Sequence, residues 1–309
     1  MTSIKENSLR HSVKQKNRSK IKVKLYGGLG NQMFQYAAAK AVALRTDADL
    51  FYDTEYFVHP EKFGSQWSYQ LHLLNTHIKP ISKKTTDSLF YFIYRIFRKL
   101  DSKNIRFSKF FFEKIHSYDS RIHDVNGNTW LDGYFQSEKY FKNIRSEILT
   151  DFFPRHQSDE PNGKISAQMK AEDSVSLHVR RGDYISNQAA AVTHGTCNKE
   201  YYEKAISYFE SKIKKPVFYV FSDDLDWAQK NIQSKSEIHF IGHNQGSQSY
   251  LDMYLMSSCR NHIIANSSFS WWGAWLNTCA KKIVIAPARW YLDPKIETKD
   301  IYPEEWLKF

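Results

Sequence analysis

Cysteine and long apolar runs are scarce in this sequence of 309 residues, and both absences limit the class of protein. The three cysteines, Cys197, Cys259 and Cys279, are odd in number and show no C-x-x-C spacing, which argues against a disulfide framework and a zinc site. No apolar run approaches the ~18 residues of a membrane-spanning helix, and residues 1–20 lack the apolar segment of a secretory signal. We therefore expect a cytoplasmic protein.

Common catalytic signatures are also missing. The sequence contains no G-x-S-x-G, no H-E-x-x-H and no Walker loop ending in G-K-[ST]. The glycine-rich segment GGLGN at 27–31 matches the dinucleotide fingerprint G-x-G-x-x-G poorly, because Met33 stands where the last glycine belongs. The same turn is still expected to bring backbone N–H groups and Asn31 to a ligand cleft.

The composition predicts a folded and strongly basic protein. Hydrophobic residues make up 41% and aromatic residues 16% of the sequence, enough to form a sizeable core. A formal net charge of +11 suits nucleic acid, an anionic membrane or a phosphorylated small molecule, and charge alone does not choose among them. Residues 1–20 hold six basic residues and one glutamate without apolar periodicity, which predicts a disordered basic tail.

Two segments show the alternation of strands and helices that is typical of α/β proteins. In the first, a strand at 21–26, an alanine-rich helix at 32–45 and a strand at 48–52 predict a parallel β–α–β unit. A polar stretch at 154–173 is expected to be a linker. We predict two Rossmann-like α/β domains, 21–160 and 161–309, with a ligand cleft between them. The second segment predicts strands at 175–179, 217–221, 238–241, 262–265 and 283–286, and helices at 199–212, 225–231, 249–258 and 269–277.

The middle of the chain is less regular. It predicts a strand and turn at 130–135 and a helix at 138–149. A helix at 87–100 combines an aromatic face with basic residues, among them Arg98 and Lys99. This helix either is buried in the amino-terminal domain or makes a peripheral contact with the anionic inner face of the plasma membrane.

The segment SLHVRRGD at 176–183 places polar side chains at the end of a predicted strand. Because strand side chains alternate, His178 and Arg180 face away from the side that carries Val175, Leu177 and Val179. Arginines at the carboxyl edge of an open sheet suit bidentate recognition of phosphate oxygens. The simpler alternative is a surface salt bridge between Arg181 and Asp183 in the turn that follows.

The segment NSSFSWW at 266–272 directly follows another predicted strand. Serines at the start of a helix expose hydroxyl and N–H groups, which together form an anion site. An ordinary helix cap is the alternative, and Trp271, Trp272 and Trp275 at helical spacing predict a core face rather than a sugar platform. Two anion-binding strand ends in one sheet favour a single diphosphate that satisfies both.

The segment FSDD at 221–224 also ends a predicted strand. Paired carboxylates there can hold a divalent metal or cap the next helix. We expect Asp223 to cap the helix, and Asp224 to accept hydrogen bonds from a base or a sugar.

These motifs together resemble glycosyltransferase family 11, the α-1,2-fucosyltransferases. The resemblance rests on GGLGNQMFQYAAAKAVA, LHVRRGDY, FSDD and LDMYLMSSCRNHIIANSSFSWWGAWLN, and extends from residue 23 to about 287. It implies a GT-B type fold and inverting transfer of L-fucose from GDP-β-L-fucose to the 2-hydroxyl of a terminal β-galactoside. It further implies a bacterial role in O-antigen or capsule synthesis, with no metal or other cofactor and no nucleic-acid partner. The acceptor would be a galactose-terminated oligosaccharide, free or lipid-linked.

The resemblance also implies roles for individual residues. Arg180 would hold the β-phosphate and stabilise the charge that develops on GDP, and Arg181 would support the loop. Asp252 would read the guanine edge. The other donor-binding residues would be His178 and Asp224 near the nucleoside, Ser267, Ser268 and Phe269 in the phosphate loop, and Gly28, Gly30 and Asn31 on the sugar-phosphate side.

The general base departs from the pattern of related enzymes. The α-1,6 relatives carry a carboxylate about ten residues after the histidine, where this sequence has Gln188. His194 and Asp183 are candidates on chemical type alone, and a reaction with weak or no base assistance is the alternative. Two other functions also stay open, a non-catalytic carbohydrate-binding protein and a nucleic-acid-binding protein.

Overall fold

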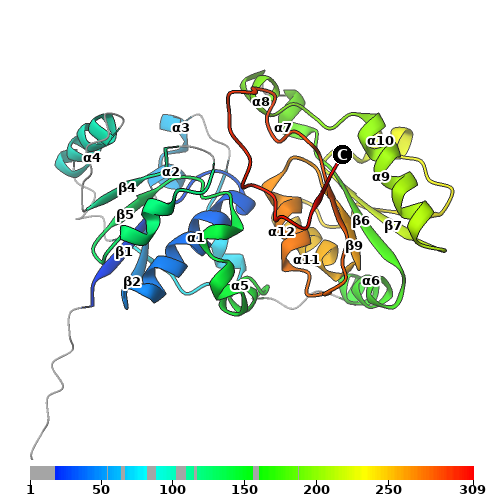
Figure 1. Ribbon diagram of the computed structural model, residues 1–309, viewed down its shortest axis with the longest axis horizontal. Coiled ribbons are helices and arrows are strands. Elements are labelled where there is room, and N and C mark those ends of the chain that lie inside the picture. Colours follow the sequence, from blue (N-terminus) through cyan, green and yellow to red (C-terminus); the bar gives the residue numbers. More distant parts are fainter. Residues whose placement is uncertain are drawn as a thin grey trace, which may run out of the picture.

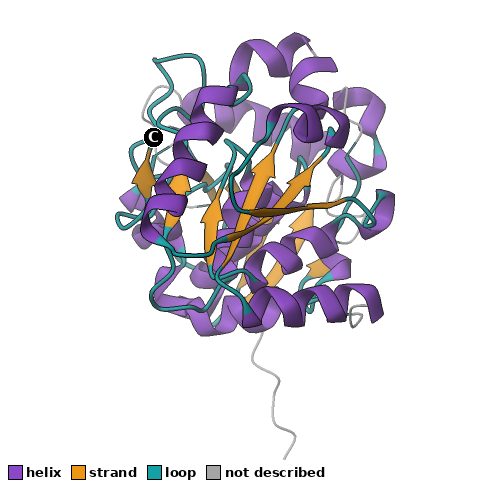
Figure 2. Ribbon diagram, turned by 90° about the vertical axis from the view of Figure 1, so that its right-hand side faces the viewer, coloured by secondary structure: helices purple, strands orange, loops and turns teal. Residues whose placement is uncertain are grey.

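The computed structural model describes residues 18–53, 55–63, 67–81, 88–101, 109–114, 117–155, 160–186 and 188–309. Residues 1–17 of the predicted tail lie outside this set. The described chain forms two parallel sheets with helices packed around them (Figures 1 and 2). None of the helices in these ranges is long and apolar enough to span a membrane.

The first sheet has the strand order β3-β2-β1-β5-β4. All its pairs are parallel, and β1 at its centre pairs Lys20 with Asp49 of β2 and Lys22 with Trp130 of β5. Its strands are β1 (Lys20–Lys24), β2 (Asp49–Asp53), β3 (Lys79–Pro80), β4 (Phe110–Phe112) and β5 (Trp130–Asp132). The helices of this half are α1 (Leu29–Arg45), α2 (Glu55–Val58), α3 (Pro60–Phe63), α4 (Ser88–Asp101) and α5 (Arg145–Asp151).

The second sheet has the strand order β11-β10-β9-β6-β7-β8 and is also parallel. Its central strand β6 is buried along its whole length. The strands are β6 (Ser174–Val179), β7 (Val217–Ser222), β8 (Glu237–Ile241), β9 (Asn261–Ile263), β10 (Val284–Ala286) and β11 (Leu307–Lys308). The helices are α6 (Glu160–Ala171), α7 (Gly182–Ser186), α8 (Gln188–His194), α9 (Lys199–Lys212), α10 (Leu225–Asn231), α11 (Tyr250–Ser258) and α12 (Ser268–Leu276).

An aromatic core joins the two halves. Phe34 of α1 packs against Trp271 and Trp272 of α12, with ring centroids 4.5 and 4.9 Å apart. The Trp272 indole N–H also donates to the Gly30 carbonyl at 2.9 Å. The prediction that the three tryptophans of this helix are core residues is confirmed, since all are at most 2% exposed. The core that they form lies between the two sheets rather than within one.

The expected linker at 154–173 is largely wrong, because α6 occupies most of it. Pro161 lies in the first turn of this helix, where a proline nitrogen has no helical hydrogen bond to lose. Met169 is buried, and the Ser166 hydroxyl lies 2.9 Å from that of Ser258 on α11. Because the apolar contribution of α6 is small, its sequence resembles a linker.

Two other local predictions also need correction. The expected helix at 138–149 is divided into short 3-10 turns at Glu138–Tyr140 and Lys142–Ile144 followed by α5. The expected turn at 181–183 is the start of α7, so the backbone of Asp183 is helical. The segment at 138–149 is nevertheless part of the core, since Tyr140, Phe141, Ile144 and Ile148 are buried.

Helix α4 combines features of both interpretations offered by its sequence. Tyr94 is buried, and Phe97 packs on Phe110 of β4 with ring centroids 5.1 Å apart. Phe92 and Ile96, by contrast, are 62% and 40% exposed. The helix therefore covers one end of the first sheet and also presents apolar side chains outward. Contact with an anionic membrane stays a prediction.

Candidate active site

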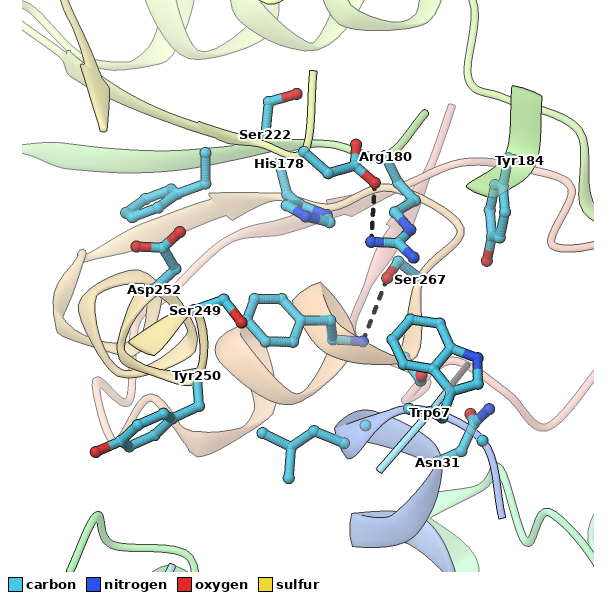
Figure 3. Close-up of a pocket in the computed structure, with 18 of the residues that line it drawn as sticks. Asn31, Trp67, His178, Arg180, Tyr184, Ser222, Ser249, Tyr250, Asp252 and Ser267 are labelled. Atoms are coloured by element: carbon cyan, nitrogen blue, oxygen red, sulfur yellow. Dashed lines mark hydrogen bonds and ion pairs between the residues drawn. The ribbon is translucent and has the colours of Figure 1, made fainter. Parts of the chain in front are cut away.

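A cavity of about 1170 Å³ lies between the two halves (Figure 3). It is lined by residues from the carboxyl ends of β6 and β7 and from the starts of α1 and α12. This is the edge at which open parallel sheets bind ligands. Figure 3 shows Asp252 on one side of the cavity and Trp67 and Asn31 on the other, with His178 and Arg180 between them.

Arg180 follows β6 and is held by Asp223 at the end of β7. Its Nη1 lies 2.8 Å from Asp223 Oδ2, and its guanidinium faces the rings of Trp67 and Tyr184 at 6.0 and 5.6 Å. The other oxygen of Asp223 accepts the backbone N–H of Arg181 at 2.8 Å. One carboxylate thus orients the arginine and the turn that carries it. The expectation that Asp223 caps a helix is wrong.

The cap of α10 is Asp224 instead. Its Oδ1 accepts the N–H of Trp227 at 3.1 Å, and its Oδ2 lies 3.2 Å from Nε of Arg181. The Arg181 guanidinium also stacks on the Trp227 ring at 4.1 Å. A salt bridge between Arg181 and Asp183 stays a prediction, because the Asp183 side chain lies outside the described part. Asp224 lines the cavity, but both its oxygens bond within the protein.

The start of α12 faces the same space. Ser267 is its N-cap, and its Oγ accepts the N–H of Phe269 at 3.3 Å. Figure 3 shows the Ser267 side chain next to the guanidinium of Arg180. The first N–H groups of a helix have no partner within it and attract anions, so a guanidinium beside a helix start has the chemistry to bind an anion.

His178 of β6 is a neutral residue of this wall. The side chain is 5% exposed, and burial lowers its pKa to about 4. Its Nδ1 has no hydrogen-bond partner among the residues that the structure describes. The ring lies 5.9 Å from that of Phe269 and points into the cavity (Figure 3). A buried nitrogen without a partner indicates a position that a ligand group completes.

Asp252 of α11 also lines the cavity. Burial raises the pKa of its carboxyl to about 7, and Asn244 Nδ2 donates to its Oδ1 at 2.8 Å. Asn244 is held in turn by Asn162 of α6 through two amide hydrogen bonds of 2.8 and 2.9 Å. This chain of buried amides fixes the orientation of the carboxylate at the cavity wall.

The first half of the chain contributes the glycine turn. Gly27 has φ +77°, and Gly28 is the N-cap of α1. A Cβ on Gly30 would lie 2.6 Å from the backbone carbon of Ser268, so α1 and α12 approach this closely only with glycine at 30. Gly28, Gly30 and Asn31 all line the cavity, as do Ser268 and Phe269.

The structure describes the side chain of only one of the two candidate bases. His194, at the end of α8, lines the cavity between Tyr184 and Tyr291, with ring centroids 4.7 and 5.1 Å away. The backbone of Asp183 lies in α7, whereas its side chain is outside the described part. Searching the described residues, we find no cluster of three histidine, cysteine, aspartate or glutamate side chains that fits a metal ion.

Several cavity residues were not found from the sequence. Trp67, Tyr134, Gln136 and Tyr291 line it, yet none belongs to a recognisable motif. Asn244 was also missed, although it lies eight residues before Asp252. For Tyr184 a signal was available, since it directly follows the arginine motif in LHVRRGDY.

Comparisons with known proteins agree with this geometry. The sequence profile of Glycosyl transferase family 11 matches residues 5–309. The chain belongs to glycosyl transferase family 11. An alpha-1,2-colitosyltransferase of Escherichia coli is 35% identical over 290 residues, which cover 92% of this chain and 97% of that protein. The O-antigen biosynthesis glycosyltransferase WbnK of Escherichia coli is 34% identical and covers 86% of this chain and 93% of its own length.

The fold of this family 11 protein is the GT-B fold. A GDP complex of a variant of FUT1 from Arabidopsis thaliana superposes with a TM-score of 0.50 at 13% identity. The match covers 86% of this chain and 70% of that one. The predicted family and fold class, two Rossmann-like domains that face one cleft, are confirmed.

Proposed function

We propose that this family 11 protein transfers L-fucose from GDP-β-L-fucose to the 2-hydroxyl of a terminal β-galactoside, in the synthesis of a bacterial O-antigen or other surface polysaccharide. The observation that carries the proposal is the sharing of one cavity by the Arg180 guanidinium, the start of α12 and the Asp252 carboxylate. An ionised carboxylate accepts two adjacent N–H donors, which guanine presents at N1 and N2. The start of α12 and Arg180 then suit a diphosphate, and the Asp252 carboxylate suits a guanine.

In the proposed reaction the galactose 2-hydroxyl oxygen attacks C1 of the fucosyl group as the bond from C1 to the phosphate oxygen breaks. The bonding electrons move to the β-phosphate of GDP. Arg180 and the N–H groups at Ser267 and Ser268 stabilise this charge as preorganised donors, so the reaction needs no metal. Because attack comes from the face opposite to GDP, the configuration at C1 inverts.

The hydroxyl proton needs an acceptor, and we favour His194 over Asp183. The His194 ring lines the cavity at the edge of an aromatic cluster. A neutral imidazole is a suitable base near pH 7. Transfer of the proton to solvent, with little help from a side chain, remains the alternative for this step.

Colitose is a second candidate for the transferred sugar, because one relative is a colitosyltransferase with 35% identity. Colitose is fucose without its 3-hydroxyl, so the GDP esters of both sugars would make the same diphosphate and guanine contacts. The comparison of kcat/KM for GDP-fucose and GDP-colitose decides between them.

The proposal predicts that GDP binds without metal and that Arg180 is required for turnover. In isothermal titration with EDTA present, GDP should bind the wild-type protein. Arg180→Ala should lower kcat with GDP-fucose and a β-galactoside by ~10²–10³, and Arg180→Lys should lose most of this activity because it cannot form a bidentate contact. Arg260→Ala removes an exposed arginine paired with Asp173 and should change neither property.

Two results would contradict the proposal. Absence of GDP binding to the wild-type protein would reject the donor. More than about a tenth of wild-type kcat in Arg180→Ala would reject the phosphate role of this residue.

A further inference from the structure

Among the residues that the structure describes, the first half of the chain contributes no charged side chain to the cavity wall. The charged lining side chains, Arg180, Asp223, Asp224, Asp226 and Asp252, all belong to the second half. Within the described ranges, the first half contributes only neutral lining residues: Gly27, Gly28, Leu29, Gly30, Asn31, Tyr56, Trp67, Gln70, Tyr134 and Gln136. The second half therefore supplies the arginine that suits phosphate groups, and the opposite wall suits an uncharged polar molecule.

The loop at 133–136, which follows β5, supplies two of these neutral residues. Phe135 has φ +53°, a left-handed conformation that a bulky residue rarely adopts. Its ring is fully buried, while Tyr134 and Gln136 on either side of it line the cavity. Backbone strain of this kind persists only where surrounding contacts impose it, and it is common at ligand sites.

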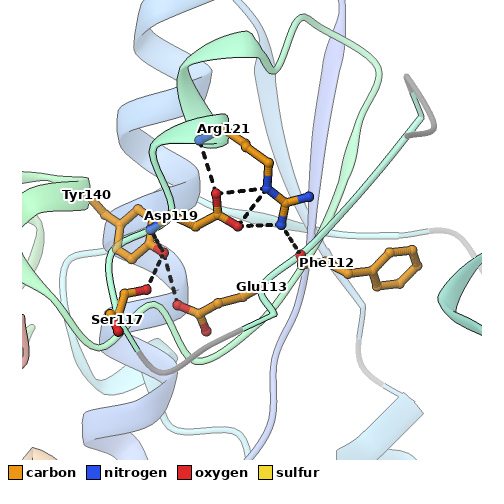
Figure 4. Close-up of polar contacts among 6 residues, drawn as sticks. All are labelled: Phe112, Glu113, Ser117, Asp119, Arg121 and Tyr140. Carbon is orange, nitrogen blue, oxygen red and sulfur yellow. Dashed lines mark hydrogen bonds and ion pairs between the residues drawn. The ribbon is translucent and has the colours of Figure 1, made fainter. Parts of the chain in front are cut away.

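The Glu113 carboxylate holds this loop by hydrogen bonds, and Figure 4 shows the same carboxylate beside the Tyr140 hydroxyl. Its Oε2 accepts the backbone N–H groups of Tyr134 and Phe135 at 2.7 and 2.9 Å. Its Oε1 accepts the hydroxyl of Tyr140 at 3.1 Å. A Cβ on Gly133 would lie 2.4 Å from that of Glu113, so the carboxylate approaches the loop this closely only beside glycine.

This arrangement buries the Glu113 carboxyl, and the burial raises its pKa to about 7. Burying a carboxylate is unfavourable unless its hydrogen bonds compensate for lost water. Here the compensating donors are two N–H groups of the strained loop and the hydroxyl of Tyr140. The buried carboxyl and the strained backbone thus stabilise each other.

Two hydrogen bonds orient the Gln136 side chain in this wall. Its Nε2 donates to Asn31 Oδ1 at 2.9 Å, and its Oε1 accepts the Tyr291 hydroxyl at 3.2 Å. The described residues thereby occupy one hydrogen and one lone pair of the amide, and the other of each is left for a ligand. An oriented amide in a cavity that tyrosine rings also line suits the hydroxyl groups and apolar faces of a sugar.

We propose that the loop at 133–136 and Tyr291 bind the terminal pyranose of the acceptor, an uncharged galactoside, and that Glu113 is the positioning residue of this site. The inference rests on the proposed transfer reaction and adds the acceptor subsite to it. Gln136 hydrogen-bonds hydroxyl groups of the acceptor sugar, and the rings of Tyr134 and Tyr291 bound its faces.

Gln136→Ala tests the subsite directly. With GDP-fucose as donor and Galβ1,3GlcNAc and Galβ1,4GlcNAc as acceptors, KM for the acceptor should rise about tenfold, the effect of one or two lost hydrogen bonds. The Kd of GDP, the Kd of GDP-fucose and the rate of GDP-fucose hydrolysis without acceptor should stay within about twofold of wild type. Gln168→Ala on the exposed side of α6 is the matched control and should change none of these values.

Glu113→Ala should raise the acceptor KM in the same way without changing the Kd of GDP. Glu113→Gln keeps one oxygen for both loop N–H groups and should restore a KM near that of wild type. If Glu113 acted in folding alone, its replacement would not raise the KM for the acceptor while leaving the Kd of GDP unchanged. If Glu113→Ala does not fold, Gln136→Ala decides the question.

An unchanged acceptor KM in Gln136→Ala would overturn the inference. A rise in the Kd of GDP-fucose without a rise in the Kd of GDP would also overturn it, because the loop would then hold the donor sugar. Failure of the wild-type protein to bind GDP is a different result, which rejects the proposed function itself.

Discussion

The cavity combines side chains whose charges are set by quite different surroundings. Arg180 forms an ion pair with Asp223, with Nη1 2.8 Å from Oδ2. His178, two residues earlier in the chain, is held neutral because burial lowers its pKa to about 4. Asp252 lies between these extremes, since burial raises its pKa to about 7. Of these residues, Asp252 is the one whose charge changes near neutral pH.

The affinity for GDP should therefore depend on Asp252 between pH 8 and pH 6. Below pH 7 the carboxyl is protonated and cannot accept both guanine N–H groups, so affinity should fall about tenfold across this range. For folding the sign is the reverse. A raised pKa in the folded state stabilises the protein at low pH, and this contribution is lost as the pH rises through about 7. Isothermal titration at pH 6, 7 and 8 measures the binding effect.

Asp252→Asn is the control for this dependence. The β-phosphate of GDP also titrates near pH 6, and its effect stays in the variant. The variant should bind GDP weakly and with a shallower pH profile. Parallel losses of affinity in variant and wild type would show that Asp252 does not contact the base. Removal of Asn244, which donates to Asp252 at 2.8 Å, should raise the pH at which affinity is lost.

Two helices meet at their starts on the cavity wall. Helix α1 begins after Gly28 and α12 begins after Ser267, and the two contact each other at Gly30. The approach is close because glycine has no side chain, and the Trp272 indole bonds the Gly30 carbonyl. Both helix starts therefore direct N–H groups toward one region, which strengthens the attraction for a diphosphate.

Gly30→Ala should separate these helices. The new Cβ would lie 2.6 Å from the Ser268 backbone, which cannot rotate away as a side chain can. We expect a loss of about 1–3 kcal/mol in the free energy of unfolding and weaker GDP binding. Urea denaturation and titration with GDP measure these effects.

Gly163→Ala is the matched control, because Gly163 is exposed within α6. There alanine should stabilise the helix by roughly 0.5–1 kcal/mol. Equal stability of Gly30→Ala and wild type would show that the contact between α1 and α12 is not as tight as the structure indicates.

At the scale of the whole molecule, the two sheets share one hydrophobic core. One continuous cluster of buried residues extends from α1 through α12 to Trp306 near the end of the chain. Trp272 is its centre, with rings of Phe34, Phe141 and Phe152 within 5.3 Å. The two halves that form the cavity are therefore packed against each other.

The wild-type protein should accordingly unfold in one transition. Trp272→Ala should lower the free energy of unfolding by about 3–5 kcal/mol and weaken GDP binding, because the indole spans both halves. Urea titration followed by far-UV circular dichroism and by tryptophan fluorescence measures both. Phe153→Ala, at a side chain that is 53% exposed, should change stability by less than about 0.5 kcal/mol. Two separate transitions in the wild type would contradict the shared core.

Much of the fold was predictable because its signals are local. The helices α9 and α10 have the bounds expected from their apolar periodicity, and the strands β6 to β10 differ from expectation by at most two residues at either end. Motifs at strand ends were found for the same reason, since Arg180, Ser267 and Asp252 each lie in or beside a regular element. Helix α6 was missed because few of its residues are apolar.

The sequence by itself determined the strands, the helices and the charged wall of the cavity, because apolar periodicity and helix caps act over a few residues. Only the tertiary structure decided the pairing of Arg180 with Asp223 and the neutral wall around Gln136. Gln136 bonds Asn31, 105 residues away, and Tyr291, 155 residues away. Such contacts depend on how whole elements pack, and no local pattern encodes them. The same holds for Glu113, whose carboxylate stabilises a strained loop that begins 20 residues later in the chain.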